Sequence, residues 1–298
     1  MNKKEHSTKN EDEFGIKAKK SLGQNFLNSD GALDAIIKAG RVVKGDTVLE
    51  IGPGKGALTK RLLSAGANVI AIEKDDRLIP VLEELFAKEI QSKQLTLIHG
   101  DVLEFDVFTY GLRTKDYKLI ANIPYYITGE ITRKFLSGNF QPSLIVVLVQ
   151  KEVAERITTT IQGSSKTKEG KESILSISVK VYGEPKYIQT VKAGCFFPPP
   201  KVDSAILLID NISKDKFKRL DSAGVYAREY GYGNDSGEGI EQKFFEVVKA
   251  GFAHKRKTLS SNLKQIISKE KLAKLGIKEN ERAENLTVEQ WLEITTKI

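Results

Sequence analysis

From position 46 to position 149 the chain alternates short β-branched and aliphatic runs with longer amphipathic stretches. Short apolar runs indicate buried strands, and helical periodicity between them indicates helices that cover a sheet. We expect strands at Thr47–Ile51, Asn68–Ile72, Leu95–Ile98, Tyr117–Ala121 and Leu144–Val149, and helices at Ala57–Ala65, Arg77–Ile90 and Gly129–Leu136. Strands that alternate with helices predict an α/β fold built on a parallel, doubly wound sheet.

The pattern changes after this sheet region. The runs Ile174–Tyr182 and Ser204–Ile209 could complete the sheet or cover it. Glycine and tyrosine then alternate with charges over 213–242, which predicts a linker or surface insertion. The remainder has a helical pattern. We therefore expect a flexible tail at 1–16, a domain at 17–210, a linker or insertion at 211–242 and a small helical domain at 243–298.

Composition narrows the class of protein. The 298 residues are 40% hydrophobic and 29% charged, as in ordinary globular proteins. The longest apolar run, Leu144–Val149, is far shorter than the roughly 20 residues of a membrane span, and Met1–Glu13 has no apolar leader segment. A single cysteine and three histidines argue against a disulfide framework or a metal cluster. We expect a soluble cytoplasmic monomer without metal or membrane partners.

The net charge of +8 is concentrated near one end. Lys243–Leu275 holds nine Lys and Arg against two acids, a balance of +7. Inside it, His254–Lys257 is bracketed by apolar residues at helical spacing, which predicts the solvated face of an amphipathic helix. A second basic cluster comprises Lys17, Lys19 and Lys20. Both clusters could contact one phosphate backbone.

The strongest motif is a glycine loop where the first predicted strand turns into a helix. Gly52, Gly54 and Gly56 follow Glu50. Glycines let the backbone approach a ligand closely and turn sharply into a helix N-terminus. The spacing differs from that of nicotinamide-binding loops. Together with Glu50 it favours the sulfonium cofactor S-adenosylmethionine.

Two further acids follow the next strands. Glu73 ends the second strand, where a carboxylate can accept both hydrogen bonds of a ribose diol. Asp101, followed by Val102, comes after the third strand and can accept from the cofactor's adenine amine. Three consecutive strand ends carry the required groups, so the sequence predicts an adenosylmethionine site.

The fourth strand leads into Asn122, Ile123, Pro124 and Tyr125. A side-chain carbonyl and a backbone carbonyl here can accept hydrogen bonds from an adenine amine and return electron density to its nitrogen. Tyr125 can stack on the base, and Phe197, before a proline run, offers a second ring. Such a base must be extruded from a helix or be unpaired.

In this order the motifs resemble the ribosomal small-subunit (16S) RNA adenine dimethyltransferases, the family linked to kasugamycin sensitivity. The resemblance runs from about Lys17 to Trp291. It is carried by Lys20–Leu27, the glycine loop, Glu73, Gly100–Asp101, Asn122–Tyr125, Phe197–Ser204, Phe252–Leu259 and Arg282–Thr287.

The resemblance implies a Rossmann-like class I methyltransferase sheet with a C-terminal all-helical domain. It implies dimethylation at N6 of two adjacent adenosines near the 3′ end of 16S rRNA, the small ribosomal subunit as partner and a role in its biogenesis. It adds Asn25 and Leu27 to the cofactor site, beside Glu50, Gly52, Gly54, Gly56, Glu73, Asp101, Val102 and Asn122. With an RNA partner, we expect the two basic clusters and Lys201 to contact it, namely Lys17, Lys19, Lys20, Lys201, Lys255, Arg256 and Lys257.

Two alternatives remain open on sequence. One is the related large-subunit (23S) adenine methyltransferase of macrolide resistance, which shares the cofactor loop and the Asn-Ile-Pro-Tyr turn. The segments Pro198–Ser204 and Lys255–Leu259 favour the small-subunit enzyme. The other is a ribosome-assembly factor without catalysis, which the intact acids and Asn122 disfavour. The 213–242 stretch is longer and richer in Gly and Tyr than the family leads us to expect.

Overall fold

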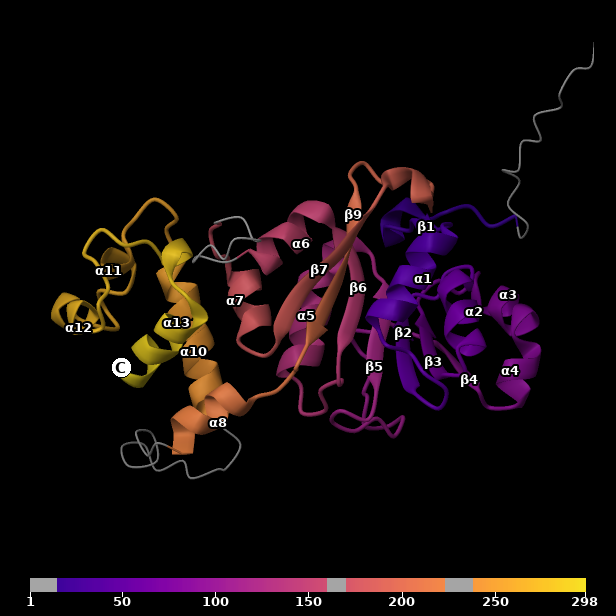
Figure 1. The fold of residues 1–298 in the computed structure, drawn as a ribbon, viewed down its shortest axis with the longest axis horizontal. Coiled ribbons are helices and arrows are strands. Elements are labelled where there is room, and N and C mark those ends of the chain that lie inside the picture. The colour runs from indigo at the N-terminus through magenta and orange to yellow at the C-terminus, as the bar shows by residue number, and fades with distance from the viewer. Residues whose placement is uncertain (1–14, 160–169, 223–237) are drawn as a thin grey trace, which may run out of the picture.

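The computed structural model describes residues 15–159, 170–222 and 238–298. A seven-stranded sheet with the order β4-β3-β2-β5-β6-β9-β7 forms its centre (Figure 1). Its strands are β2 (Thr47–Ile51), β3 (Asn68–Glu73), β4 (Leu95–His99), β5 (Lys118–Asn122), β6 (Ile145–Gln150), β7 (Glu184–Val191) and β9 (Ser204–Asp210). The pairs among β4, β3, β2, β5 and β6 are parallel, which confirms the five predicted strands and their doubly wound arrangement.

The run Ser204–Ile209 completes the sheet as β9, which was one of its two expected roles, whereas β7 lies outside the prediction. β9 is inserted antiparallel between β6 and β7, and β7 forms the edge of the sheet. The run Ile174–Tyr182 covers the sheet instead, because its first seven residues form helix α7 (Ile174–Lys180). β7 carries mostly polar residues and has exposed positions along most of its length. An edge strand of that kind shows no apolar run, which is why the pattern did not reveal it.

Helices cover both faces of the sheet. On one face lie α1 (Asp30–Ala39), α2 (Ala57–Ser64), α3 (Ile79–Leu85) and α4 (Ala87–Gln91); on the other lie α5 (Thr128–Ser137), α6 (Lys151–Thr158) and α7. Successive side chains of β2 point to opposite faces of the sheet. Val48 packs in the hydrophobic core with α1 and α2, whereas Leu49 and Ile51 pack in the core on the other face. The predicted helix Arg77–Ile90 is divided into α3 and α4 at Phe86.

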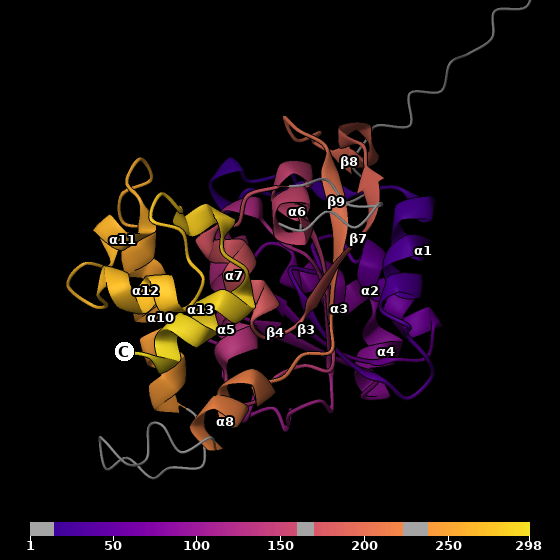
Figure 2. The same ribbon diagram turned by 60° about the vertical axis from the view of Figure 1, so that its left-hand side comes forward.

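The C-terminal helices pack against the second face. They are α8 (Asp215–Ser222), α10 (Glu238–Gly251), α11 (Leu259–Asn262), α12 (Lys269–Lys274) and α13 (Val288–Thr296). In Figure 1 and Figure 2, α10 and α13 stand next to α7, and α11 and α12 lie farther from the sheet. Tyr182, Phe217, Phe244 and Trp291 belong to the same hydrophobic core as the sheet residues Leu119 and Val147. The helical part is therefore joined to the sheet by continuous apolar packing.

The predicted linker at 211–242 is helical at both described ends. Phe217 of α8 is completely buried, and α10 begins at Glu238. The middle of this stretch, 223–237, lies outside the described residues, as do residues 1–14 of the predicted tail. Among the helices of the described ranges, none combines the length and apolar character of a membrane-crossing segment.

The prediction of a helix through His254–Lys257 is wrong. α10 ends at Gly251, and α11 starts only at Leu259. A Cβ at Gly251 would lie 2.3 Å from Cη2 of Trp291, and Nδ2 of Asn262 donates to the Gly251 carbonyl at 2.6 Å. The Asn262 side chain thus occupies a carbonyl at the end of the helix, and the four basic residues that follow lie in an exposed turn.

A small second sheet brings two distant segments together. β1 (Phe26–Leu27) pairs antiparallel with β8 (Phe196–Phe197), and the Asn28 amide donates to the Cys195 carbonyl at 2.7 Å. The segment before α1 is thus attached to the chain that precedes β9, beside the carboxyl ends of the parallel strands.

Candidate active site

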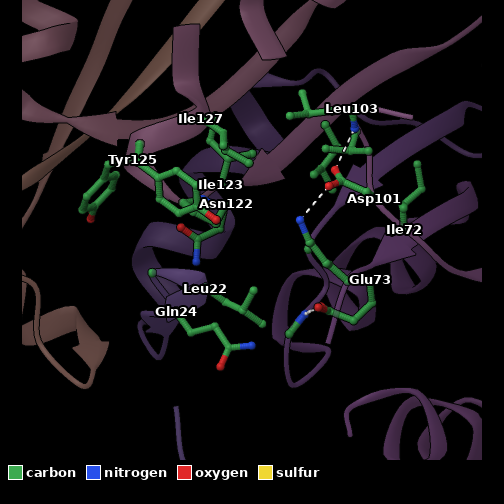
Figure 3. A pocket seen from close by; sticks show the side chains of 18 of the residues that line it. Leu22, Gln24, Ile72, Glu73, Asp101, Leu103, Asn122, Ile123, Tyr125 and Ile127 are labelled. Carbon is green, nitrogen blue, oxygen red and sulfur yellow. Dashed lines mark hydrogen bonds and ion pairs between the residues drawn. The ribbon is translucent and has the colours of Figure 1, made fainter. Parts of the chain in front are cut away.

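A cavity of about 240 Å³ opens at the carboxyl ends of β2, β3, β4 and β5 (Figure 3). Ligand sites of open α/β sheets form at this edge, because the turns after parallel strands meet there. Ten residues predicted from the sequence line the cavity: Asn25, Gly52, Gly54, Glu73, Asp101, Val102, Asn122, Ile123, Pro124 and Tyr125. Glu73 and Asp101 lie on one side, with Asn122 and Tyr125 on the other.

The three loop glycines are required for different reasons. All have φ between +59° and +81°, a region that other residues rarely adopt. A Cβ at Gly56 would lie 2.6 Å from the Phe86 ring, and one at Gly54 would lie 3.0 Å from Phe26, so these positions are filled by protein. At Gly52 the nearest atom would be 3.9 Å away. Gly52 therefore leaves its open side to the cavity.

Glu73 is held by the loops around it. Its carboxylate accepts the amide hydrogens of Gly54 at 3.1 Å and of Asp75 at 2.8 Å, and the residue is 5% exposed. Burial raises the pKa of Glu73, against the effect of these hydrogen bonds. A carboxylate can accept about four hydrogen bonds, so capacity remains for a further donor. The side chain is thus a fixed acceptor at the cavity wall, which suits a diol.

Asp101 is bound by a residue that the motifs did not single out. Its Oδ1 accepts from the Leu103 amide at 2.9 Å, and Nζ of Lys74 lies 2.6 Å from its Oδ2. The Lys74 hydrogen bond is the main reason why the pKa of Asp101 is lowered. The carboxylate stays ionised and remains an acceptor over the cavity (Figure 3).

The orientation of the Asn122 amide follows from a contact with the N-terminal segment. Asn122 ends β5, and its Nδ2 donates to the Asn25 carbonyl at 3.0 Å. Among the described residues no group donates to Asn122 Oδ1. The amide therefore offers its oxygen to a ligand, because its nitrogen is engaged elsewhere.

The turn after Asn122 is rigid. Ile123 is buried, and Pro124 supplies a carbonyl but no amide hydrogen. The hydroxyl of Tyr125 is 2.6 Å from Oγ of Ser204, which is completely buried in β9. Burial raises the pKa of Tyr125, with the Ser204 hydrogen bond acting in the opposite direction. The ring is therefore held neutral and fixed by its outer end.

Four predicted site residues do not line the cavity. Leu27 is a buried core residue, and Gly56 is the N-cap of α2, packed on Phe86. Phe197 is 49% exposed and lies opposite Phe26, a lining residue, in the small sheet, whereas Phe196 is buried. Phe197 is thus one strand away from the cavity.

Glu50, the fourth, lies inside the protein behind the glycine loop. It is 1% exposed, and neither its Oε2 nor the nearby Thr59 hydroxyl has a hydrogen-bond partner among the described residues. Burial, reinforced by the Glu73 charge, raises the pKa of Glu50 to about 8. At neutral pH the carboxyl is mainly protonated.

The cavity also contains residues that sequence reasoning missed. They are neighbours of the predicted ones, namely Leu22, Gly23, Gln24, Phe26, Ile51, Ile72, Lys74, Gly100, Leu103, Tyr126, Ile127 and Glu130. Gln24 donates to Asp75 at 2.8 Å and so attaches the N-terminal segment to the loop after β3. The available signal was adjacency to a motif, which does not say whether a side chain faces the ligand.

The seven basic residues predicted as nucleic-acid contacts are exposed at three places: Lys17, Lys19 and Lys20 before β1, Lys201 before β9, and Lys255, Arg256 and Lys257 in the turn before α11. Within the described ranges, no three His, Cys, Asp or Glu side chains gather in a group that could hold a metal ion.

Comparisons with known proteins agree on one family. Residues 15–223 match the family described as ribosomal RNA adenine dimethylase. The ribosomal RNA small subunit methyltransferase A of Dehalococcoides mccartyi is 39% identical over 285 residues, which cover 93% of this chain and 87% of the relative. The protein of the same name from Clostridium acetobutylicum is 33% identical over 292 residues, 96% of each chain.

Solved structures agree with this fold. The dimethyladenosine transferase of Plasmodium falciparum has a TM-score of 0.67 at 26% identity, covering 90% of this chain and 95% of that one. The 23S rRNA methyltransferase ErmE has a TM-score of 0.62 at 21% identity, covering 91% of this chain and 98% of that one. The second likeness concerns the fold alone.

Proposed function

The chain belongs to the ribosomal RNA adenine dimethylase family, and on that premise we propose that it is a 16S rRNA adenine-N6,N6-dimethyltransferase. It transfers methyl groups from S-adenosylmethionine to two adjacent adenosines near the 3′ end of small-subunit rRNA and acts during subunit biogenesis. It works in the cytoplasm, where its substrate is assembled. That it acts as a monomer stays a prediction.

The observation that carries this proposal is the orientation of Asn122. Its oxygen is left as an acceptor because its nitrogen donates to the Asn25 carbonyl. An adenine amine is a hydrogen-bond donor with a delocalised lone pair, so acceptors at its hydrogens localise electron density on the nitrogen. The Ile123 or Pro124 carbonyl supplies the second acceptor, and the turn has no proline N–H to oppose it.

The opposite wall of the cavity suits S-adenosylmethionine. Glu73 would accept hydrogen bonds from the ribose hydroxyls, ionised Asp101 would accept from the adenine amine, and the open side of Gly52 would let the cofactor approach the backbone. When bound, the cofactor supplies an electrophilic methyl group. Because the target amine becomes acidic as it attacks, positioning and acceptors carry the step, and a strong general base is not needed.

The target base needs support once it has left its stack. Tyr125, anchored by Ser204, would lie against one face of the base, and exposed Phe197, paired with the lining residue Phe26 in the small sheet, would offer the second ring. Aromatic stacking offsets part of the cost of extruding an adenosine, which is a few kcal/mol.

The large-subunit alternative is tested directly. Unmethylated small and large subunits are incubated with the protein and tritiated S-adenosylmethionine, and the labelled nucleotides are mapped. We expect label only in small subunits, as N6,N6-dimethyladenosine at two adjacent positions. Label confined to large subunits would assign the macrolide-resistance activity instead. Subunit binding without any transfer would leave an assembly factor.

A further inference from the structure

Tyr126 is an aromatic side chain that the proposed reaction does not yet use. It lines the cavity and is 62% exposed, the largest exposed fraction among the large apolar side chains in the described part of the chain. Tyr125, the preceding residue, is anchored by Ser204, whereas no hydrogen bond holds the Tyr126 hydroxyl within the described residues. An aromatic ring left in water at the rim of a pocket is a candidate contact for a ligand.

The backbone around Tyr126 fixes where the ring stands. It belongs to a short 3₁₀ turn, Tyr125–Ile127, in which the Ile127 amide donates to the Pro124 carbonyl at 3.2 Å. A Cβ at Gly23 would lie 3.1 Å from Cε1 of Tyr126. Because Gly23 has no side chain, the Tyr126 ring packs against the N-terminal segment there. The rest of the ring surface stays exposed.

Basic residues lie near this ring in the chain and at the rim of the cavity. Gly23 caps the short helix Lys20–Leu22, so Lys19 and Lys20 are within one turn of the ring contact, and both are exposed. Lys74 lies at the same rim: its pKa is raised mainly by its bond to Asp101, with a smaller effect from Tyr126. An open aromatic ring beside basic side chains is the composition of a single-stranded nucleotide site, in which the ring stacks on a base and the cations contact phosphate.

We propose that Tyr126 is the platform on which the nucleotide next to the target adenosine stacks. This inference rests on the proposed function, in which two adjacent adenosines are methylated. Extruding one adenosine deprives its neighbour of a stacking partner. Tyr126 directly follows the residue that holds the target base, and so it stands where that neighbour needs a new surface. The same contact holds the second adenosine near the pocket between transfers.

The test compares Tyr126→Ala and Tyr126→Phe with the wild-type protein on unmethylated small subunits. Loss of one base–aromatic stack lowers kcat/KM by roughly 5- to 100-fold for the alanine variant. The phenylalanine variant keeps the ring and retains activity within about twofold of wild type. Affinity for S-adenosylmethionine, measured by titration without RNA, stays unchanged in both variants. Tyr110→Ala is the matched control, because Tyr110 is 42% exposed and lies outside the cavity lining.

A second measurement identifies the partner base. Small subunits are assembled with rRNA in which one adenosine of the pair is replaced by uridine, which stacks more weakly. If Tyr126 stacks on that neighbour, Tyr126→Ala and the uridine replacement are not additive: the variant's loss shrinks on the replaced subunits. Each adenosine of the pair is replaced in turn. The replacement that is not additive with Tyr126→Ala shows on which side of the target adenosine the stacked nucleotide lies.

The outcomes separate this inference from its premise. If the wild-type protein does not label small subunits, the proposed function fails. If the wild-type protein is active and Tyr126→Ala keeps its kcat/KM, the platform is refuted. Equal losses in the alanine and phenylalanine variants, a weakened cofactor affinity, or strict additivity with both uridine replacements would also refute it.

Discussion

The site depends on single hydrogen bonds that orient side chains, and the Asn25–Asn122 contact is the most consequential of them. Removing the Asn122 side chain deletes the acceptor for the target amine and leaves the Asn25 carbonyl without its donor. We expect Asn122→Ala to lower transfer to small subunits by at least about 100-fold, the scale seen when a catalytic hydrogen-bonding group is lost. Binding of rRNA should stay within about twofold, since the basic residues proposed to contact RNA are unchanged. Near-normal turnover in the variant would contradict the mechanism. Filter binding of rRNA is the control, because it separates a loss of transfer from a loss of binding.

Glu50 leads to a prediction about pH at the same scale. The pKa of its buried carboxyl is raised from 4.5 to about 8, so the folded protein binds this proton more tightly than the unfolded chain does. The stability contributed by protonated Glu50 is present below about pH 4.5 and is lost as pH rises through 8. Glu50→Gln keeps the neutral shape at every pH. We expect it to be more stable than wild type by roughly 1 kcal/mol or more at pH 8.5, and similar at pH 5.

The measurement for Glu50 is urea unfolding at pH 5, 7 and 8.5. Glu83→Gln is the control, because Glu83 is exposed on α3. Its unfolding midpoint should follow the wild-type curve at all three values. Parallel pH profiles for Glu50→Gln and wild type would mean that the Glu50 carboxyl is already ionised in the folded protein.

At this scale the sequence predicted the residues that end strands. Glu73, Asp101 and Asn122 line the cavity because parallel strands bring their carboxyl ends to one edge. Lys74 and Tyr126 were not predicted, since which side of a turn faces the ligand depends on backbone dihedral angles that have no pattern in the sequence. Glu50 was placed at the cofactor because of its motif, yet its position in β2 turns it into the core.

Between elements, a buried polar contact ties α10 to the connection between α7 and β7. The Tyr182 hydroxyl donates to Oε1 of Glu241 at 2.6 Å, and Nζ of Lys214 lies 3.1 Å from Oε2. Tyr182→Phe removes the donor and leaves a buried carboxylate oxygen unsatisfied, which costs about 1–3 kcal/mol of the free energy of unfolding. Urea titration measures this loss. The control is Tyr187→Phe, which removes a hydroxyl contact to Thr190 on the edge strand β7 and should cost less than about 1 kcal/mol. Equal losses in the two variants would mean that water replaces the Tyr182 hydroxyl at Glu241.

Element prediction succeeded where apolar periodicity is strong and failed where tertiary contacts decide. β2 was predicted to the residue because it is buried on both faces. The helix expected through His254–Lys257 does not form: α10 ends at Gly251, whose carbonyl accepts from the Asn262 side chain. Propensity cannot reveal a helix end that depends on a side chain from a later element.

At the scale of the whole molecule, most of the net positive charge lies in Lys243–Leu275, a segment of the C-terminal helical part. The basic turn of Lys255, Arg256 and Lys257 is exposed between α10 and α11, and α10 to α13 lie beyond α5 and α7 in Figure 1. Continuous apolar packing joins these helices to the sheet. If this turn contacts phosphate as proposed, it would fix the position of the RNA relative to the sheet without touching the target bases.

This arrangement predicts a salt-dependent contribution to subunit binding. Replacing Lys255, Arg256 and Lys257 by Glu removes up to three phosphate contacts, and each contact contributes roughly 0.7–0.9 to the slope of log K against log salt concentration. We expect weaker binding at low salt and a slope that is shallower by about 2, with unchanged affinity for S-adenosylmethionine. The control reverses Lys60, Lys88 and Lys93, which are exposed on and after α2 and α4, on the side of the sheet away from α10 to α13. Both triple variants change the net charge equally. A shallower salt slope in both would therefore reflect the overall electrostatic field of the protein. A shallower slope in the first variant alone would locate the RNA contact at the turn before α11.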